Sequence, residues 1–159
     1  QSLYLQEKVS PPDVDKAFGR LLSTLKHLHT LDARALSGCS CFDGSSLRRL
    51  AAPEKLRRCV LKINSQCRPQ LQGLAKCTNL VHLESFGCWS FESRSLQSIA
   101  GLTKLEHLDL HGNQALDDVG LKHLSRLANL KHLNVSDGQT TEEGWKHLPT
   151  YGKGLVVVV

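Results

Sequence analysis

LTKLEHLDLHGN, residues 102–113, is the stretch of this 159-residue chain that decides its fold. Leu105, Leu108 and Leu110 are separated by charged or polar residues, and Asn113 follows three residues after Leu110. Because successive side chains of a strand point to opposite faces, Leu108 and Leu110 are expected to point inward and the residues beside them toward solvent. The stretch therefore predicts one half-buried strand followed by a turn.

Close relatives of this stretch recur along the chain at a nearly constant period. The first strand leucine of each unit follows the previous one after 24 or 25 residues, at Leu31, Leu56, Leu80, Leu105, Leu130 and Leu155. A period of about 20 to 50 residues is typical of solenoids, in which each unit buries its apolar face only against its neighbours. The sequence thus predicts about 5 or 6 stacked repeats over residues 31–159.

Two further positions of each unit carry the pattern. The fourth position is apolar in most units, and Arg34 in the first unit is the clear exception. The ninth position is expected to be structural and holds Cys39, Asn64, Cys88 and Asn113. An Asn amide at this position is expected to hydrogen-bond backbone groups that the turn would otherwise leave buried and unpaired.

The segments between the strands are predicted to be short helices. Leu121, Leu124 and Leu127 show the three-residue spacing that places apolar side chains on one helix face. The pattern L-x-x-L-x-L-x-x-N/C with a GLxxL helix resembles the leucine-rich repeat family, in particular its cysteine-containing subclass and related bacterial and protozoan repeats. The resemblance covers roughly residues 22–159. It implies an α/β solenoid, or horseshoe, with a parallel concave β-sheet and short convex helices, in which Cys is a small replacement for Asn at the ninth position.

The two ends of the chain are less regular. Residues 1–30 are predicted to form an N-terminal cap or a partial repeat with a helix, because Val14, Phe18 and Leu22 have helical spacing. Residues 155–159 predict a sixth, apolar strand at the edge of the sheet, which a further element is expected to cover. Together with the absence of methionine, these features predict that the chain is a piece of a longer protein.

The composition favours a globular protein, with 40% hydrophobic and 22% charged residues. No apolar run approaches the roughly 20 residues that span a bilayer, so no membrane partner is expected. The six cysteines are expected to be buried reduced thiols, because their slots in the repeat hold them apart and Cys39 and Cys41 lack a second pair for zinc. Reduced thiols indicate an intracellular protein, with the cytoplasm as the expected location and an organelle or the nucleus as alternatives.

The candidate binding residues are those expected on the concave face, at the third, fifth and seventh positions of the strands. They are Arg58, Lys62, His82, Glu84, Phe86, His107, Asp109, His111, His132 and Asn134. Metal binding and acid-base catalysis fit this face poorly, because laddered side chains stand parallel and an open surface does not exclude water. We therefore expect no catalytic residue, metal, cofactor or small-molecule substrate. The simplest alternative is that these positions are only solvated and the partner binds elsewhere.

Three functions remain open. The favoured one is a non-enzymatic protein-protein interaction module, or scaffold, that binds a partner through the concave strand face with Phe86 as an apolar anchor. The family resemblance also implies a second, the substrate-recognition arm of an F-box-type ubiquitin ligase, although the chain holds no F-box-like segment. The third is an RNA-associated scaffold that uses the basic segment Arg48 to Arg68, where seven Lys and Arg residues stand against one Glu, a net charge of +6. Because this segment has no aromatic residue, it would hold RNA by backbone charge alone.

Overall fold

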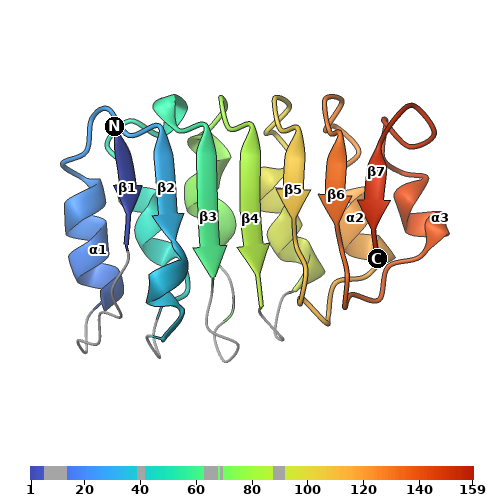
Figure 1. Ribbon diagram of the computed structural model, residues 1–159, viewed down its shortest axis with the longest axis horizontal. Helices are drawn as coiled ribbons and strands as arrows, with labels where there is room; N and C mark the ends of the chain where they lie inside the picture. The colour runs from blue at the N-terminus through green and yellow to red at the C-terminus, as the bar shows by residue number, and fades with distance from the viewer. Residues whose placement is uncertain (6–13, 39–41, 63–67, 69, 88–91) are drawn as a thin grey trace.

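The computed structural model describes residues 1–5, 14–38, 42–62, 68, 70–87 and 92–159. Within these residues, seven strands stack in chain order into one parallel sheet (Figure 1). They are β1 (Ser2–Tyr4), β2 (Thr30–Ala33), β3 (Arg58–Lys62), β4 (His82–Phe86), β5 (His107–Asp109), β6 (His132–Asn134) and β7 (Val156–Val158). The predicted parallel solenoid is confirmed.

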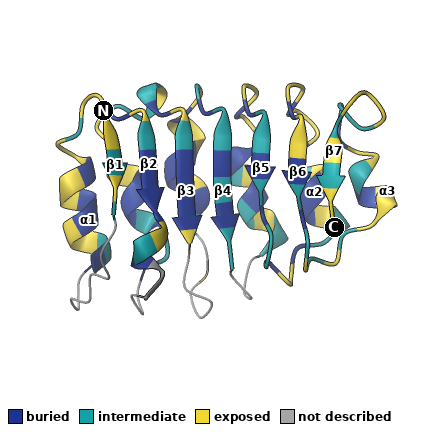
Figure 2. Cartoon of the chain, in the orientation of Figure 1, coloured by how far each residue is buried: buried dark blue, intermediate teal, exposed yellow. Residues whose placement is uncertain are grey.

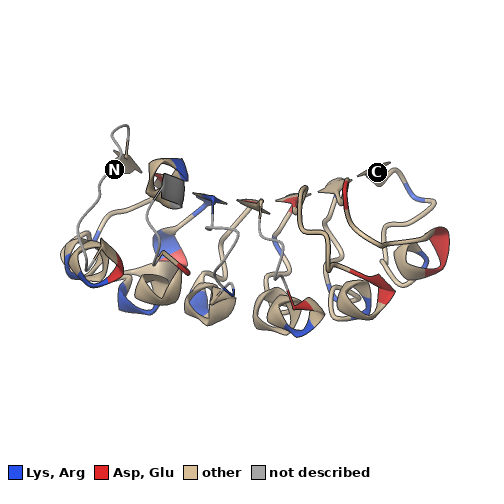
Figure 3. Ribbon diagram, turned by 90° about the horizontal axis from the view of Figure 1, so that it is seen from below, with Lys and Arg blue, Asp and Glu red and all other residues tan. Residues whose placement is uncertain are grey.

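The helical segments follow the strands and mostly cover one side of the sheet. They are α1 (Val14–Leu22), η1 (Arg34–Gly38), η2 (Ser45–Arg49), η3 (Pro53–Lys55), η4 (Leu71–Lys76), η5 (Ser93–Ile99), α2 (Asp118–Lys122) and α3 (Glu142–Trp145), where η denotes a 3-10 helix. Figure 3 shows the sheet as a shallow arc with most of these segments on its outer side. The opposite, inner face of the sheet is therefore the concave one.

The central units use 3-10 rather than α-helical turns. In a 3-10 helix, residues i and i+3 lie directly above one another, so an apolar pair with this spacing points in one direction. Leu71 and Leu74 in η4, and Leu96 and Ile99 in η5, are such pairs and are fully buried. The three-residue spacing in the sequence is thus satisfied by a tighter helix than the α-helix.

A continuous hydrophobic core fills the space between the sheet and the helical segments. Leu56, Leu80 and Leu105, the first-position leucines of three successive units, are fully buried in it, as are the inward strand residues Leu83 and Leu108. Figure 2 shows β3 buried along most of its length, whereas β6 and β7 are mainly exposed or half-buried. Each unit therefore contributes inward side chains to a core shared with its neighbours.

The strand pairing corrects the repeat register at the N-terminal end. Leu31 lies opposite Cys59, so it occupies the fourth position of its unit and not the first. The first position is taken by Leu28, which is also buried. Arg34 therefore leaves the inward fourth position, where it was a misfit, and becomes an exposed residue of η1.

The same shift moves the ninth position of the first unit. Counting from Leu28, that position is Leu36, which is buried. Cys39, to which the sequence assigned this role, lies outside the described residues. The repeat was misplaced because Leu28 and Leu31 are three residues apart, so either can be taken as the first leucine of the unit. The sequence alone therefore allows two repeat frames.

A one-residue correction applies at the C-terminal end. Leu133 pairs with Val157, which puts Val157 and not Val158 at the inward fourth position. Leu155 then occupies the second position of its unit, where it is half-buried. Because one residue changes the face of a strand, Val158 projects from the concave face and is 48% exposed.

Residues at the N-terminal end follow the strand-then-helix order of the later units. In β1, Leu3 pairs with Leu31 in parallel, and α1 follows with Phe18 and Leu22 buried against the core. This arrangement supports the partial-repeat interpretation of residues 1–30 over a separate cap.

Among the described helices, none is long and apolar enough to cross a bilayer.

Asn113 makes the backbone hydrogen bonds expected of a ninth-position residue. Its Nδ2 atom donates to the carbonyl oxygens of Ser85, at 2.8 Å, and Leu110, at 2.7 Å. The side chain is fully buried and joins the turn of its own unit to the preceding strand. The other two expected residues, Asn64 and Cys88, lie outside the described part of the chain.

Two cysteines are described, and both are buried free thiols. Burial raises the pKa of Cys59 well above its ordinary value and that of Cys77 to about 12. Neither thiol ionises near neutral pH, so both act as small apolar groups in the core.

Candidate functional site

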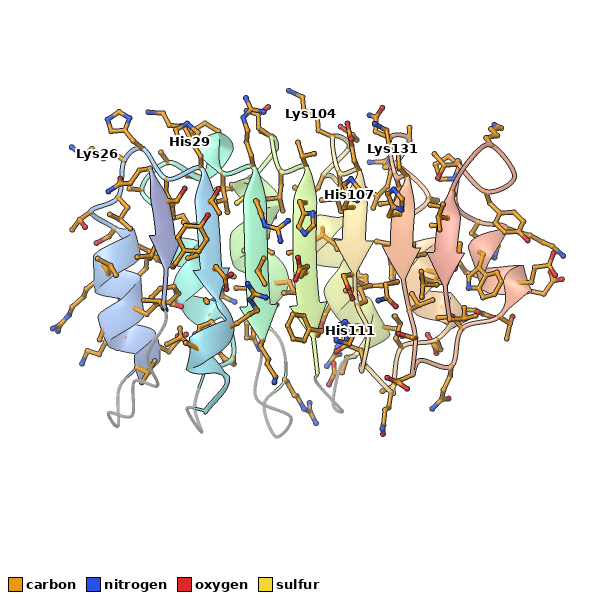
Figure 4. All side chains as sticks on the ribbon, viewed as in Figure 1. Lys26, His29, Lys104, His107, His111 and Lys131 are labelled. Atoms are coloured by element: carbon orange, nitrogen blue, oxygen red, sulfur yellow. The ribbon has the colours of Figure 1, made fainter. Side chains whose placement is uncertain are left out.

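The parallel pairing aligns the concave side chains in three rows across β3 to β6. The first row is Arg58, His82, His107 and His132; the second is Glu84, Asp109 and Asn134; the third is Lys62, Phe86 and His111. Figure 4 looks onto this face, with His107 in the upper part of β5 and His111 just beyond its lower end. The structure thus brings together all ten residues that the sequence proposed for partner binding.

The first row is a stack of imidazole rings. The rings of His107 and His132 are nearly parallel, with centroids 4.6 Å apart and 8° between their planes. His82 stands on the other side of His107 at 5.5 Å and 31°. This spacing follows from strand pairing, which separates neighbouring strands by about 4.7–4.9 Å. Partial burial, and then the nearby His132 and His82 rings, lower the pKa of His107 from its ordinary value.

The second row consists of polar groups that hold one another in place. Glu84 Oε1 accepts a hydrogen bond from Arg58 Nη2 at 2.6 Å and lies 2.6 Å from His82 Nε2. Asp109 Oδ1 lies 2.7 Å from His111 Nδ1, and its Oδ2 accepts from Asn134 Nδ2 at 3.2 Å. Both carboxylates are therefore fixed by neighbouring strands before any partner arrives.

The third row presents the main apolar group of the surface. Phe86 stacks on His111 with ring centroids 4.6 Å apart and 16° between the planes. His111 is in turn held by Asp109, so the Phe86 ring has an ordered neighbour on one side. Phe86 remains half-exposed, and Lys62 lies beside it on β3 as an exposed cation.

The concave face is closed at its N-terminal end, which the sequence did not reveal. Val60 lies on the concave face, opposite Glu84 in the strand pairing, yet it is fully buried. On its other side lies Asp32, which pairs with Arg34 at 2.6 Å. Burial opposes ionisation of Asp32, but the hydrogen bonds and charge of Arg34 outweigh it and lower the pKa of Asp32. The corrected register starting at Leu28 would have placed Asp32 here.

The open part of the face contains a shallow depression with a volume of about 140 Å³. First-row and second-row residues of β4 to β6 line it, together with Leu108, Leu133 and Val158. Among the described residues, no group of three or more His, Cys, Asp or Glu side chains is arranged to hold a metal ion. Hydrogen bonding, ring stacking and apolar contact are the interactions this surface offers.

The basic segment does not form one surface. Arg58 is engaged by Glu84 on the concave face, whereas Arg48 projects from η2 and donates to Gln72 Oε1 at 3.2 Å. Lys55 lies at the edge before β3 and donates to the carbonyl of Lys26 at 3.1 Å. The positive charge is thus divided among three parts of the solenoid, which weakens the RNA hypothesis.

Acidification should destabilise the protein through His107. Because its pKa is lowered in the folded chain, the unfolded chain takes up more protons as the pH falls. This loss of stability is absent well above the ordinary pKa of 6.5, begins as the pH falls through it, and is complete below the lowered pKa. Urea unfolding at a series of pH values should show a shallower decline for His107→Phe, which keeps a stacking ring but binds no proton. Identical pH dependence in the two proteins would contradict this assignment.

No known family profile and no curated protein sequence matches the chain. Solved structures do match it. Internalin C2 from Listeria monocytogenes superposes with a TM-score of 0.58 at 24% identity, covering 86% of this chain and 54% of the internalin. A leucine-rich repeat protein from Leptospira interrogans gives 0.63 at 16%, covering 99% and 36%. The internalin inlF from Listeria monocytogenes gives 0.55 at 17%, covering 99% and 46%.

These similarities establish the class of fold: the chain is a leucine-rich repeat solenoid. It spans about half or less of the length of each of the structures named above.

Proposed function

We propose that the chain is a non-enzymatic interaction module that binds another protein through the open concave face of β4 to β6. The observation that carries the proposal is the half-exposed Phe86 ring, stacked on His111 and surrounded by ordered polar groups. Curved solenoids generally use their extended concave surfaces for binding. The concave face of this chain has the composition expected of a contact centre, with aromatic rings inside a polar margin.

The order already present in this face favours binding. Glu84 and Asp109 are held by Arg58 and His111, and the ring stacks restrict the imidazoles. A partner that contacts these side chains would immobilise little that is still mobile, so less of the contact free energy is lost to conformational entropy. The same pairing argues against acid-base catalysis, because both carboxylates are already engaged by cations or imidazoles on an open surface.

The buried free thiols support an intracellular location for this module. Cys59 and Cys77 are unpaired, as expected in a compartment that keeps cysteines reduced.

Binding should weaken when the concave face is truncated. The test is a protein partner captured from native lysate and then measured in purified form against Phe86→Ala/His107→Ala/His111→Ala. We expect at least about a tenfold loss of affinity, since truncating central aromatic contacts commonly costs about 2 kcal/mol or more. Isothermal titration calorimetry gives the affinity, and circular dichroism checks that the variant remains folded.

The matched control removes the same kinds of side chain from the convex side. The control variant is Val119→Ala/His123→Ala/His147→Ala. Val119 is an exposed residue of α2, His123 is a half-exposed residue just after α2, and His147 is an exposed residue just after α3. This variant should bind as the unchanged protein does. If instead the concave variant keeps full affinity, the interface lies on another surface and the proposal fails.

A further inference from the structure

The concave face satisfies its carboxylates but leaves two imidazoles with unused hydrogen-bonding capacity. Glu84 and Asp109 each receive hydrogen bonds from neighbouring strands. Within the part of the chain that the structure describes, the rings of His107 and His132 stack on one another without a side-chain hydrogen bond to the protein. These two rings border the depression, so a ligand there can reach their nitrogens.

The geometry of the pair suits a planar anion with two oxygens. The ring planes are within 8° of parallel, the ring centroids are 4.6 Å apart, and both residues line the depression. Two N–H groups at this spacing can both reach the two oxygens of one carboxylate within the usual distance of about 2.7–3.2 Å. Such a bridge gives the carboxylate two hydrogen bonds, which strengthen when the rings carry charge.

The size of the depression limits what can enter. Its volume of about 140 Å³ lies well below the roughly 300–1,000 Å³ of pockets that enclose a whole small molecule. It accommodates the end of one side chain, with Val158 available to its methylene groups. An acidic side chain from a protein bound across the concave face fits both the room and the donors.

The charged groups around His107 and His132 allow an anion to bind there. On β4, His82 and Glu84 face it, and Arg58 behind them balances Glu84. Glu106, just before β5, is paired with Lys131 at 2.8 Å, and Asp109 at the end of β5 is paired with His111 at 2.7 Å. On the far side β7 contributes only Val156 and Val158 to these rows. Each nearby carboxylate thus has its own partner, and protonation of the imidazoles makes the site cationic.

We propose that His107 and His132 together bind an acidic side chain of the protein partner, and that this contact strengthens as the pH falls from about 7 toward 5.5. The proposal deepens the function proposed above and rests on it. The bound carboxylate favours the imidazolium form, so binding takes up protons and stabilises the charged form of His107, which its surroundings otherwise disfavour. The module would then hold acidic partners more tightly in mildly acidic surroundings.

The test uses a minimal probe with a matched control. N-acetylglutamate N-methylamide carries the carboxylate, and N-acetylglutamine N-methylamide has the same shape without the charge. Imidazole nitrogen resonances of the folded protein are followed by NMR while each probe is added at about pH 7.5 and about pH 5.5. We expect saturable shifts at His107 and His132 with the glutamate probe alone, at least about threefold tighter binding at the lower pH, and a raised pKa of His107.

Two variants test the assignment to these rings. His107→Phe and His132→Phe keep a stacking ring but remove the N–H donors, and each should abolish binding of the glutamate probe. The control His147→Phe changes an exposed histidine beyond α3 and should leave binding unaltered. Equal shifts with both probes, or undiminished binding in the phenylalanine variants, would overturn the carboxylate site but not the proposed interface. Full partner affinity in the concave alanine variant would instead overturn the interface, whatever the probe does.

Discussion

Replacing Asn113 by alanine should lower the free energy of unfolding by about 3 kcal/mol, because a buried acceptor left without a donor costs about 1–3 kcal/mol. The Nδ2 atom of Asn113 donates to two carbonyls, those of Ser85 and Leu110, from a fully buried position. Alanine cannot replace either hydrogen bond, and water has no direct access to the site. Urea unfolding measures the loss, which is large for a domain of this size.

Asn129 provides the matched control. Its Nδ2 atom also donates to a carbonyl of the preceding unit, that of Thr103 at 2.7 Å, but the side chain is exposed. Water can replace this donor, so Asn129→Ala should cost less than about 1 kcal/mol. Equal losses in the two variants would show that burial of the ninth-position amide does not determine its contribution.

Gly73→Ala should be at least as damaging, for a steric reason. An alanine Cβ at this position in η4 would lie 2.5 Å from the backbone nitrogen of Arg48 and 2.5 Å from the carbonyl carbon of Leu47. These are backbone atoms of the neighbouring unit, so they cannot rotate away as a flexible side chain can. Overpacking commonly costs about 1–3 kcal/mol, and we expect about 3 kcal/mol or more here because η2 must shift from η4.

Gly101 is the corresponding open site. A Cβ there would meet nothing within 4 Å, and its backbone does not require a left-handed conformation. Gly101→Ala should therefore be neutral or slightly stabilising, by up to about 1 kcal/mol, through reduced freedom of the unfolded chain. Thermal unfolding of the two variants compares the effects, and a stable Gly73→Ala protein would contradict the close packing of η2 on η4.

The central units could be predicted from the sequence because their pattern is unambiguous. In the unit that starts at Leu105, the leucines and Asn113 each have one possible role, and the structure gives them that role. At the ends the pattern is degenerate. Leu28 and Leu31 fit two frames, and a run of valines after Leu155 fits any frame, so strand pairing alone decides the register.

The composition of the candidate site was predictable, but its internal order was not. Alternation along the strands is enough to place His107 and His132 in one row. The stacking of their rings, the engagement of Glu84 by Arg58 and the burial of Val60 depend on side-chain conformations and on neighbours from other units. A one-dimensional pattern contains the period of the solenoid and not these cross-strand contacts.

The chain-order stacking of the sheet also determines how the molecule would respond to tension. A force applied between its two ends runs along the solenoid, across each strand pairing in turn, so the pairings carry the same load in series. The pairing of β3 with β4 joins five residue pairs and that of β2 with β3 joins four, whereas each of the other pairings joins three. The three-pair pairings on either side of β2 to β4 should therefore part first, and the part of the sheet from β2 to β4 should be the last to separate.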